Sequence, residues 1–223
     1  MALILNIETS TKTCSVNLSK NGKSLGVNEI TSEKYVHGEK LHLLIKDLFG
    51  SLNLSLKQLN AVAVSAGPGS FTGLRIGVAT AKGLAFGLDI PLISMNSLEI
   101  MINCYHNKFT NDNALYFPMI DARRKEVYTA GYNSQKKQIT EIACPHINSE
   151  FLKKFKNYQR HYFLGDGALK FKGEFNSEIV EIDGSVPNSS TGMSCKTFEK
   201  FKNKEFESIP YFNPYYLKDF FTG

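Results

Sequence analysis

The stretch Ala61–Gly87, AVAVSAGPGSFTGLRIGVATAKGLAFG, decides the fold class of this chain. It begins with a short apolar strand, Ala61–Ser65, which runs into a tight glycine-rich turn. Ser70 or Thr72 then caps a helix that is expected to continue to about Gly87, because short hydroxyl side chains are favourable N-caps. A buried strand that leads directly into a helix is typical of α/β folds, in which helices pack on a sheet.

The elements on either side of this stretch complete the first half of the chain. Leu3–Ile7 is an apolar run that ends at Glu8. Asn21-Gly22 is a strong hairpin signal, because both residues tolerate a positive φ. The remaining strands are expected near Cys14–Leu18, Leu25–Ile30 and Leu92–Ser94, and the remaining helices at Glu33–Phe49, with Gly50 as its C-cap, and from Asn96 or Ser97 onward. The first half therefore has the element order β-β-β-α-β-α-β-α.

The second half repeats this order. Strands are expected near Leu115–Ile120, Glu126–Tyr132, Ile139–Ala143, Tyr162–Leu164 and Ile179–Ile182, and helices at Ser149–Phe155, after Gly165-Asp166-Gly167 and near Ser190–Phe201. In both halves an acid ends the first strand, Glu8 or Asp121, and a Gly-x-Gly follows the fourth strand. These matched positions favour a duplication over a chance likeness of two α/β patterns.

The predicted architecture is α/β with two duplicated βββαβαβα lobes, each a mixed five-stranded sheet covered by helices. The lobes are expected at residues 1–106 and 107–223, with the boundary in the polar stretch 107–113. Two such lobes facing each other describe the actin-like ATPase, or ASKHA, architecture.

Composition and charge exclude several classes of protein. The 223 residues are 42% hydrophobic and 21% charged, which is ordinary for a globular protein. No apolar run has the roughly 18 residues of a membrane helix, and the first residues lack the basic region of a signal peptide, so a cytoplasmic protein is expected. The net charge of +5 is spread over both halves, which argues against an independent tRNA-binding module. The four cysteines include no Cys-x-x-Cys pair and are expected to be reduced thiols.

The glycine-rich turn Gly67–Gly77 does not match the known phosphate-binding signatures. No lysine follows Gly73, so it is not a P-loop, and Pro68 removes one backbone donor. Ser70 is not at the centre of a Gly-x-Ser-x-Gly nucleophile elbow. A structural turn is favoured over autonomous phosphate binding.

Small residues recur on the helix after this turn. Gly73, Gly77, Ala81 and Ala85 are four residues apart and lie on nearly one face. Each interior glycine costs about 1 kcal/mol relative to alanine, so some contact must offset it. Close packing on the chain's own sheet is one explanation, and a helix–helix interface with another protein is the other. For the interface, we expect Gly77→Leu to abolish pairing and leave the monomer folded.

Candidate catalytic and metal-binding groups are sparse. His37 and His42 are five residues apart, about 140° around a helix, so they cannot both face one metal ion. Glu8 and Asp121 occupy positions where an ASKHA ATPase places carboxylates that face a metal ion and phosphate. However, Thr9 stands where such an enzyme needs glycine for close approach of phosphate to the hairpin. Catalysis by this chain alone is therefore not expected, and neither is a bound metal.

Four segments resemble the TsaB (YeaZ) family of bacterial proteins. They are NIETSTKTCSVNL, SAGPGSFTGLRIGVATAKGLAFGLDIPLISMNSLE, IDARRKEVYTAGY and PYYLKD. The match as a whole runs along most of the chain, from Leu3 to Asp219. Residues 134–208 match the family only at the Gly165-Asp166-Gly167 turn.

The resemblance implies an ASKHA fold and a non-catalytic role in making N6-threonylcarbamoyladenosine (t6A) on tRNAs that read codons starting with A. It implies that the chain dimerises with the catalytic paralogue TsaD, that the ATPase TsaE docks on the pair, and that the chain forms a homodimer when TsaD is absent. ATP and a divalent metal are then expected in the partners, with no cofactor bound by this chain alone and tRNA contacted only through the complex.

The resemblance also places the pairing face on the first-lobe helices, which correspond to Glu33–Phe49 and Thr72–Gly87. The expected interface residues are Val36, Leu41, Leu44, Leu48, Phe71, Gly73, Gly77, Ala81 and Ala85. Arg75, Asp121 and Arg123 are candidates for a surface that faces a nucleotide or tRNA. The rival interpretation is an autonomous ASKHA-type ATPase, kinase or peptidase, which would turn over ATP or cleave a peptide without partners.

Overall fold

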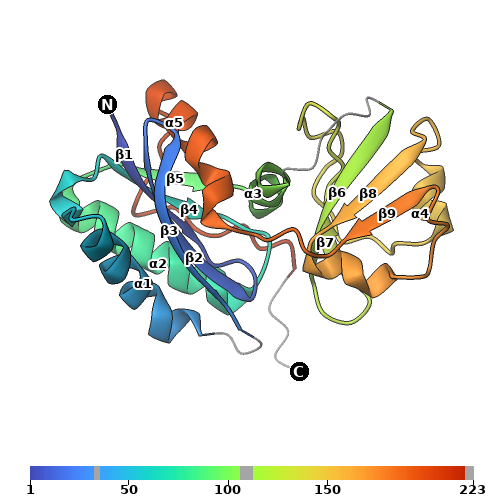
Figure 1. The fold of residues 1–223 in the computed structure, drawn as a ribbon, viewed down its shortest axis with the longest axis horizontal. Coiled ribbons are helices and arrows are strands. Elements are labelled where there is room, and N and C mark those ends of the chain that lie inside the picture. The colour runs from blue at the N-terminus through green and yellow to red at the C-terminus, as the bar shows by residue number, and fades with distance from the viewer. Residues whose placement is uncertain (33–35, 106–112, 219–223) are drawn as a thin grey trace. The chain divides into compact units, whose positions relative to one another are not determined.

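A computed structural model of the chain describes residues 1–32, 36–105 and 113–218. The chain divides into two compact units, Met1–Ile100 together with Asn188–Gly223, and Met101–Pro187. Figure 1 shows both units with their elements labelled.

The first unit is built on a mixed five-stranded sheet, as predicted. Its strand order is β3-β2-β1-β4-β5. The strands are β1 (Leu3–Glu8), β2 (Thr13–Lys20), β3 (Lys23–Thr31), β4 (Ala61–Ser65) and β5 (Leu92–Met95). β1, β2 and β3 pair antiparallel, whereas β4 lies parallel to both β1 and β5. Asn21 and Gly22 form the turn between β2 and β3 with φ values of 51° and 80°, which confirms the hairpin.

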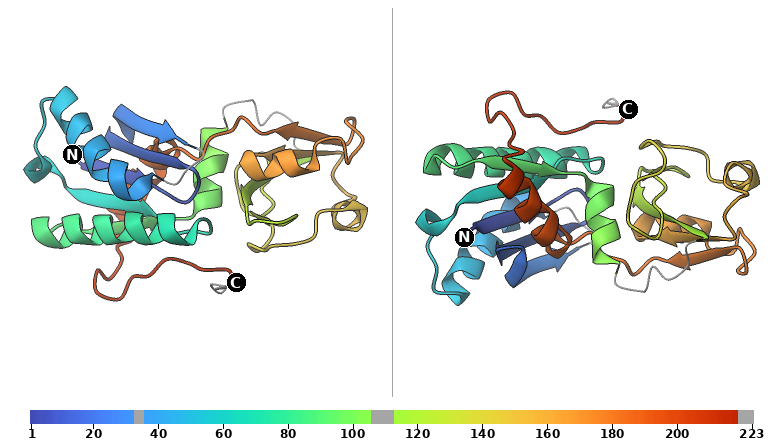
Figure 2. Two further views of the ribbon diagram at one scale, coloured as in Figure 1. Left: turned by 90° about the horizontal axis from the view of Figure 1, so that it is seen from below. Right: turned by 90° about the horizontal axis from the view of Figure 1, so that it is seen from above.

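Two helices cover the apolar face of this sheet, α1 (His37–Ser51) and α2 (Phe71–Leu88), and they lie side by side (Figures 1 and 2). The Ser70 side chain accepts a hydrogen bond from the Gly73 amide, so the predicted cap is confirmed. The prediction for the end of α1 is wrong, because Gly50 lies inside the helix and Asn53 takes the left-handed conformation instead. The predicted start of that helix at Glu33 falls outside the described residues. A short 3₁₀ helix, η1 (Leu56–Gln58), follows α1.

The opposite face of the sheet is polar, and the segment Asn188–Asn203 covers it. This segment contains η3 (Ser190–Met193) and α5 (Ser194–Asn203). Its side chains bond to the strands, because Thr197 Oγ1 donates to Asn6 Oδ1 and Ser194 Oγ donates to Asn17 Oδ1, each at 2.8 Å. We call these contacts the polar layer. Buried polar groups need such partners, since leaving one unpaired costs roughly 1–3 kcal/mol.

The second unit contains a four-stranded sheet with the order β7-β6-β8-β9. Its strands are β6 (Ala114–Asp121), β7 (Val127–Thr129), β8 (Arg160–Leu164) and β9 (Val180–Asp183), and its helical elements are α4 (Ser149–Lys153) and the 3₁₀ helix η2 (Asp166–Phe171). Helix α3 (Ser97–Cys104) begins in the first unit and ends in the second.

The second half therefore departs from the predicted five strands. β7 ends at Thr129 rather than Tyr132, and the expected strand Ile139–Ala143 makes only isolated bridges, such as that of Ala143 with Thr129. The segment still bonds to the chain that follows β7, because the amides of Ile139 and Thr140 donate to the Gly131 carbonyl oxygen, but these contacts do not form a continuous ladder. A turn at Asn133–Lys137 precedes it. Lys136 in this turn has a positive φ of 60°.

The predicted division at residues 106 and 107 is also wrong. The helix near Ser190–Phe201 belongs to the first unit, because its polar face bonds to β1 and β2. The polar stretch 107–113 lies mostly outside the described residues. No helix in the described part of the chain is long and apolar enough to cross a membrane.

Candidate helical interface

The predicted stripe of small residues on α2 faces the chain's own sheet. A β-carbon on Gly73 would collide with the carbonyl oxygen of Thr9, and one on Gly77 would collide with the Thr9 hydroxyl. Both glycines are buried. These glycines let α2 approach the turn after β1. Of the two explanations for the stripe, packing on the chain's own sheet is therefore correct for Gly73 and Gly77, rather than an interface with another protein.

The other buried members of the predicted interface belong to the same core. Ala81, Ala85 and Leu41 are fully buried, and Leu48 is 1% exposed. All four pack in the cluster between the helices and the sheet. The prediction that these residues meet a partner is therefore wrong. The stripe does approach a neighbouring backbone closely, but that backbone is the chain's own, at β1 and β4.

Three predicted interface residues are only half-buried. Val36 precedes α1 and accepts hydrogen bonds from the amides of Glu39 and Lys40, and Leu44 packs against the edge of the core. The ring of Phe71 lies 4.7 Å from that of Tyr216 between centroids.

Arg75 covers the same aromatic ring, because its guanidinium carbon lies 4.1 Å from the centroid of Phe71. The arginine side chain is exposed, so it remains accessible from solvent. Such cation–π contacts contribute about 0.5–1 kcal/mol at exposed sites.

A second stripe of small residues, which sequence reasoning missed, faces solvent on α2. Ala79, Gly83 and Gly87 are exposed, and a β-carbon on either glycine would meet nothing within 4 Å. This stripe is offset by two residues from Gly77, Ala81 and Ala85, which corresponds to about 200° around the helix. The spacing by four was a signal for both stripes, but only burial shows which one faces outward.

Beside this outer stripe lies a groove of about 670 Å³. Its lining is mainly apolar and comes from α1, from the segment after it and from α2: His42, Ile45, Lys46, Phe49, Gly50, Leu54, Ser55, Leu56, Lys57, Thr80, Leu84 and Leu88. Phe86, near the end of α2, is 80% exposed. We call the groove, the outer stripe and Phe86 together the helical face. Exposed apolar surface of this kind marks protein-binding sites.

The turn after β1, where an ASKHA ATPase would bind phosphate, is closed by the chain's own residues. Glu8, Thr9 and Ser10 are fully buried. The Ser10 amide donates to Glu8 Oε1 at 2.5 Å, and Asn188 Nδ2 donates to Ser10 Oγ at 2.7 Å. Burial raises the pKa of Glu8 to about 7, so a large share of this carboxyl is protonated near neutral pH. A buried and partly neutral acid is a poor ligand for a cation.

The two histidines also lie in different environments. His37 is 1% exposed at the start of α1, and its burial lowers the pKa of the imidazole. His42 is exposed on the same helix and lines the groove. Within residues 1–32, 36–105 and 113–218, no group of three or more His, Cys, Asp or Glu side chains is placed to hold a metal ion.

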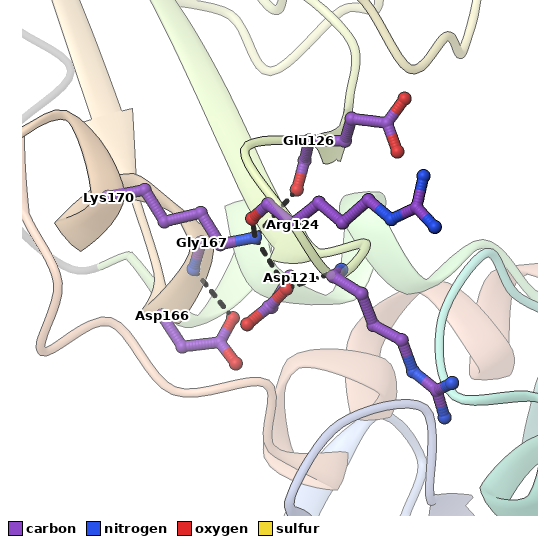
Figure 3. Close-up of polar contacts among 7 residues, drawn as sticks. Asp121, Arg124, Glu126, Asp166, Gly167 and Lys170 are labelled. Atoms are coloured by element: carbon purple, nitrogen blue, oxygen red, sulfur yellow. Dashed lines mark hydrogen bonds and ion pairs between the residues drawn. The ribbon is translucent and has the colours of Figure 1, made fainter.

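In the second unit, Asp121 lies at the centre of a polar cluster (Figure 3). The Lys170 ammonium donates to Asp121 Oδ1 at 2.6 Å and to the carbonyl oxygens of Arg124 and Glu126, each at 2.8 Å. Asp121 Oδ1 also accepts the Arg123 amide at 2.6 Å. Asp121 therefore stabilises its own loop. Of the three residues predicted to face a nucleotide or tRNA, Asp121 and Arg123 share this loop, whereas Arg75 belongs to the first unit.

The loop between β6 and β7 has an unusual backbone. Arg123 and Arg124 have φ values of 66° and 48°, both in the left-handed region. This conformation costs an ordinary residue roughly 1–2 kcal/mol. The two hydrogen bonds across the turn, from Ala122 N to Glu126 O and from Glu126 N to Arg123 O, are each 3.1 Å long. Gly167 lets η2 approach the end of β6, because a β-carbon there would lie 2.8 Å from the Met119 carbonyl oxygen.

Comparisons with known proteins place this arrangement in a family context. Residues 27–162 match the family model described as "TsaD: tRNA N6-adenosine threonylcarbamoyltransferase". The chain is 36% identical over 226 residues to the tRNA threonylcarbamoyladenosine biosynthesis protein TsaB of Escherichia coli K12, an alignment that covers 97% of this chain and 94% of the relative.

Two solved structures share the fold. YeaZ from Pseudomonas aeruginosa aligns with a TM-score of 0.77 at 24% identity and covers 97% of this chain and 100% of that chain. The activator of the 2-hydroxyisocaproyl-CoA dehydratase from Clostridium difficile aligns with a TM-score of 0.55 at 10% identity, with 92% and 98% covered. The predicted ASKHA-type α/β fold is thereby confirmed.

Proposed function

Because this chain belongs to the TsaB family of tRNA threonylcarbamoyladenosine biosynthesis proteins, we propose that it is the scaffold and activator subunit that pairs with the catalytic paralogue TsaD. The helical face on α1 and α2 is the pairing surface. The observation that carries this proposal is the apolar groove of about 670 Å³ beside the exposed stripe of Ala79, Gly83 and Gly87. A stripe without bulky side chains lets a helix of the partner approach closely, and the groove receives its larger side chains.

The match to the TsaD family model supports a partner of the same fold. A paralogue carries helices that correspond to α1 and α2, so the two proteins can pair with like faces together. The same face then allows a homodimer of this chain when TsaD is absent, since an isologous contact uses one patch twice. Activation of TsaD requires that this chain bind one conformation of its partner more tightly than another.

The closed turn at Glu8 and Thr9 supports a subunit without catalysis of its own. The start of α2 packs directly on this turn, because a β-carbon on Gly73 would collide with the Thr9 carbonyl oxygen. On this proposal, ATP and a divalent metal bind in TsaD and TsaE, TsaE docks on the pair, and tRNA is contacted through the complex. The rival, an autonomous ATPase, kinase or peptidase, requires metal-dependent ATP turnover or peptide cleavage by the isolated chain.

Light scattering on a sizing column tests the pairing. The chain is run alone and mixed with TsaD from the same organism. We expect a heterodimer to form at about 10 μM, which corresponds to roughly −7 kcal/mol. A folded chain that forms no complex at that concentration would contradict the scaffold function.

Two leucine substitutions locate the surface. Gly83→Leu places a bulky side chain on the outer stripe, where the monomer has open space, so the chain stays folded and we expect the affinity for TsaD to fall at least tenfold. Asn157→Leu adds a leucine at an exposed position in the second unit and serves as the control. Equal affinity of the two variants would exclude the outer stripe from the interface.

A further inference from the structure

Arg75 is held on the outer side of α2 by an aromatic support that the C-terminal segment completes. Its guanidinium carbon lies 4.1 Å from the centroid of the Phe71 ring, and that ring lies 4.7 Å from the ring of Tyr216. The segment that carries Tyr216 is attached to α2 in turn, because Lys82 Nζ donates to the Phe212 carbonyl oxygen at 3.0 Å. The guanidinium is therefore positioned within the monomer, before any partner binds.

The charged residues of α2 leave this guanidinium without a carboxylate. α2 carries two basic side chains, Arg75 and Lys82, and no acidic one. Lys82 bonds to the C-terminal segment, whereas Arg75 is exposed and forms no ion pair within the part of the chain that the structure describes. Asp89, the residue that caps the end of α2, is exposed as well and forms no ion pair among the described residues.

Both charges stand near the end of α2 that disfavours them. The N-terminus of a helix carries a partial positive charge and the C-terminus a partial negative charge. Arg75 lies in the second turn of α2, near the positive end, and Asp89 lies at the negative end in a left-handed conformation with a φ of 53°. A second helix packed antiparallel would reverse both relationships, because its negative end would lie beside Arg75 and its positive end beside Asp89.

The spacing of the outer stripe fits a second copy of the same helix. Ala79 and Gly83 are exposed, and such small residues let two helix backbones approach closely. When a two-fold axis passes midway between them, Ala79 of one copy meets Gly83 of the other, and Arg75 comes level with Gly87. Asp89 is two residues further along, about 3 Å along the helix axis, which is within reach of the long arginine side chain.

The same arrangement gives the exposed Phe86 an apolar neighbour. Phe86 is 80% exposed in the monomer. In the antiparallel pair it comes level with Ile76 of the second copy, which is only half-buried in the monomer. The small residues then lie at the centre of the contact, and the bulky and charged residues lie at its two ends.

We propose that two copies of this chain pair through antiparallel α2 helices, and that Arg75 of each copy binds the Asp89 carboxylate of the other. This inference rests on the proposed function, because it concerns the same helical face. Each ion pair occurs twice, as in every isologous contact. Arg75 and Asp89 thereby determine specificity, since they favour a helix with opposite charges at the matching positions and repel one with like charges.

Sedimentation of the isolated chain at concentrations from about 1 to 100 μM tests the ion pair. Arg75→Asp brings two carboxylates together and Asp89→Arg brings two cations together, so each variant should weaken self-association at least tenfold. The double variant Arg75→Asp/Asp89→Arg exchanges the charges and should recover the affinity of the unmodified chain to within about threefold. Lys156→Asp, an equal charge reversal at an exposed position of the second unit, is the control and should leave self-association unchanged.

Asp89→Asn separates the charge from the fold. Asparagine tolerates the left-handed conformation, so this variant should remain folded, which circular dichroism verifies, and self-association should weaken at least threefold. A rise in salt from about 50 to 500 mM should weaken the unmodified dimer more than the dimer of Asp89→Asn, because salt screens an exposed ion pair. An equal salt dependence of the two proteins would contradict the ion pair.

Two further results would overturn the inference. They are a chain that stays monomeric at about 100 μM, and a double variant that associates no better than the single variants. Mixing the same variants with TsaD distinguishes this failure from failure of the proposed function, because pairing with TsaD can persist where self-association is absent. Weaker pairing of Arg75→Asp with TsaD, together with unchanged self-association, would assign Arg75 to the TsaD contact and exclude the ion pair between copies.

Discussion

The hydroxyl of Thr9 occupies the space that a β-carbon at Gly77 would need. The turn after β1 and helix α2 therefore fit together only with glycine at that position. This contact changes the expectation for Gly77→Leu, which must disturb the folded monomer before it can affect any interface.

Substitutions on the two sides of α2 should have opposite effects on stability. Gly73→Ala forces a β-carbon onto the Thr9 carbonyl oxygen, and such overpacking costs about 1–3 kcal/mol. Gly83→Ala adds a β-carbon in open space, and better helix propensity should raise the free energy of unfolding by up to about 1 kcal/mol. Urea denaturation of both variants measures the difference. Equal denaturation midpoints for the two variants would show that a β-carbon at position 73 fits without strain.

The stability of the first unit should fall as the pH rises through the range where Glu8 titrates. The pKa of this acid rises from 4.5 to about 7 on folding, so the folded chain binds the proton more tightly than the unfolded chain. Between these two values the free energy of unfolding decreases with pH, by about 3 kcal/mol in total, and it levels off above pH 7.

Thermal unfolding of Glu8→Gln from pH 4 to pH 8 checks this contribution. The glutamine has a similar shape and no titrating proton, so its pH profile should be flatter than that of the unmodified chain by the same amount. If the two proteins showed parallel pH profiles, Glu8 would not be the cause of the pH dependence of stability.

The polar layer predicts a large effect from a small side-chain change. Thr197→Val keeps the shape of residue 197 but removes the hydroxyl that donates to Asn6, leaving a fully buried amide oxygen without that donor. We expect a loss of roughly 1–3 kcal/mol in the free energy of unfolding. Thr72→Val, at an exposed position on α2, is the control and should change stability little.

The backbone strain at Arg123 and Arg124, in the loop between β6 and β7, can also be measured as a change in the free energy of unfolding. Arg124→Gly removes the cost of a left-handed residue and should raise stability by about 1 kcal/mol or less, because glycine also gains freedom in the unfolded chain. Lys125→Gly, at the neighbouring position without a positive φ, should lower stability instead. A loss of stability in both variants would indicate that the backbone of Arg124 is not strained.

Local signals in the sequence predict most of the first unit correctly. The apolar runs, the Asn21-Gly22 hairpin and the Ser70 cap place its strands and the start of α2, because each depends on a few adjacent residues. The second half is less accurate, since its expected third strand, Ile139–Ala143, makes only isolated bridges and has no continuous partner in the sheet.

The interface prediction fails for a different reason. A spacing of four residues shows that small side chains share one face of α2, but Ala81 and Gly83 belong to two such stripes about 200° apart around the helix. Only the packing of Thr9 against Gly77 identifies the inner side. The contacts of Lys170 could not be predicted from the sequence either, because Asp121 and Lys170 are 49 residues apart and only the fold brings them together.

The route of the chain also determines when the first unit can be completed during synthesis on a ribosome. Asn6 is made among the first residues, whereas its partner Thr197 follows 191 residues later, after the whole of the second unit. Until then the side-chain oxygens of Asn6 and Asn17 lack the hydroxyl donors that Thr197 and Ser194 supply. The second unit, which is contiguous, can close first, so the lobe whose synthesis begins earliest is the last to reach its native state.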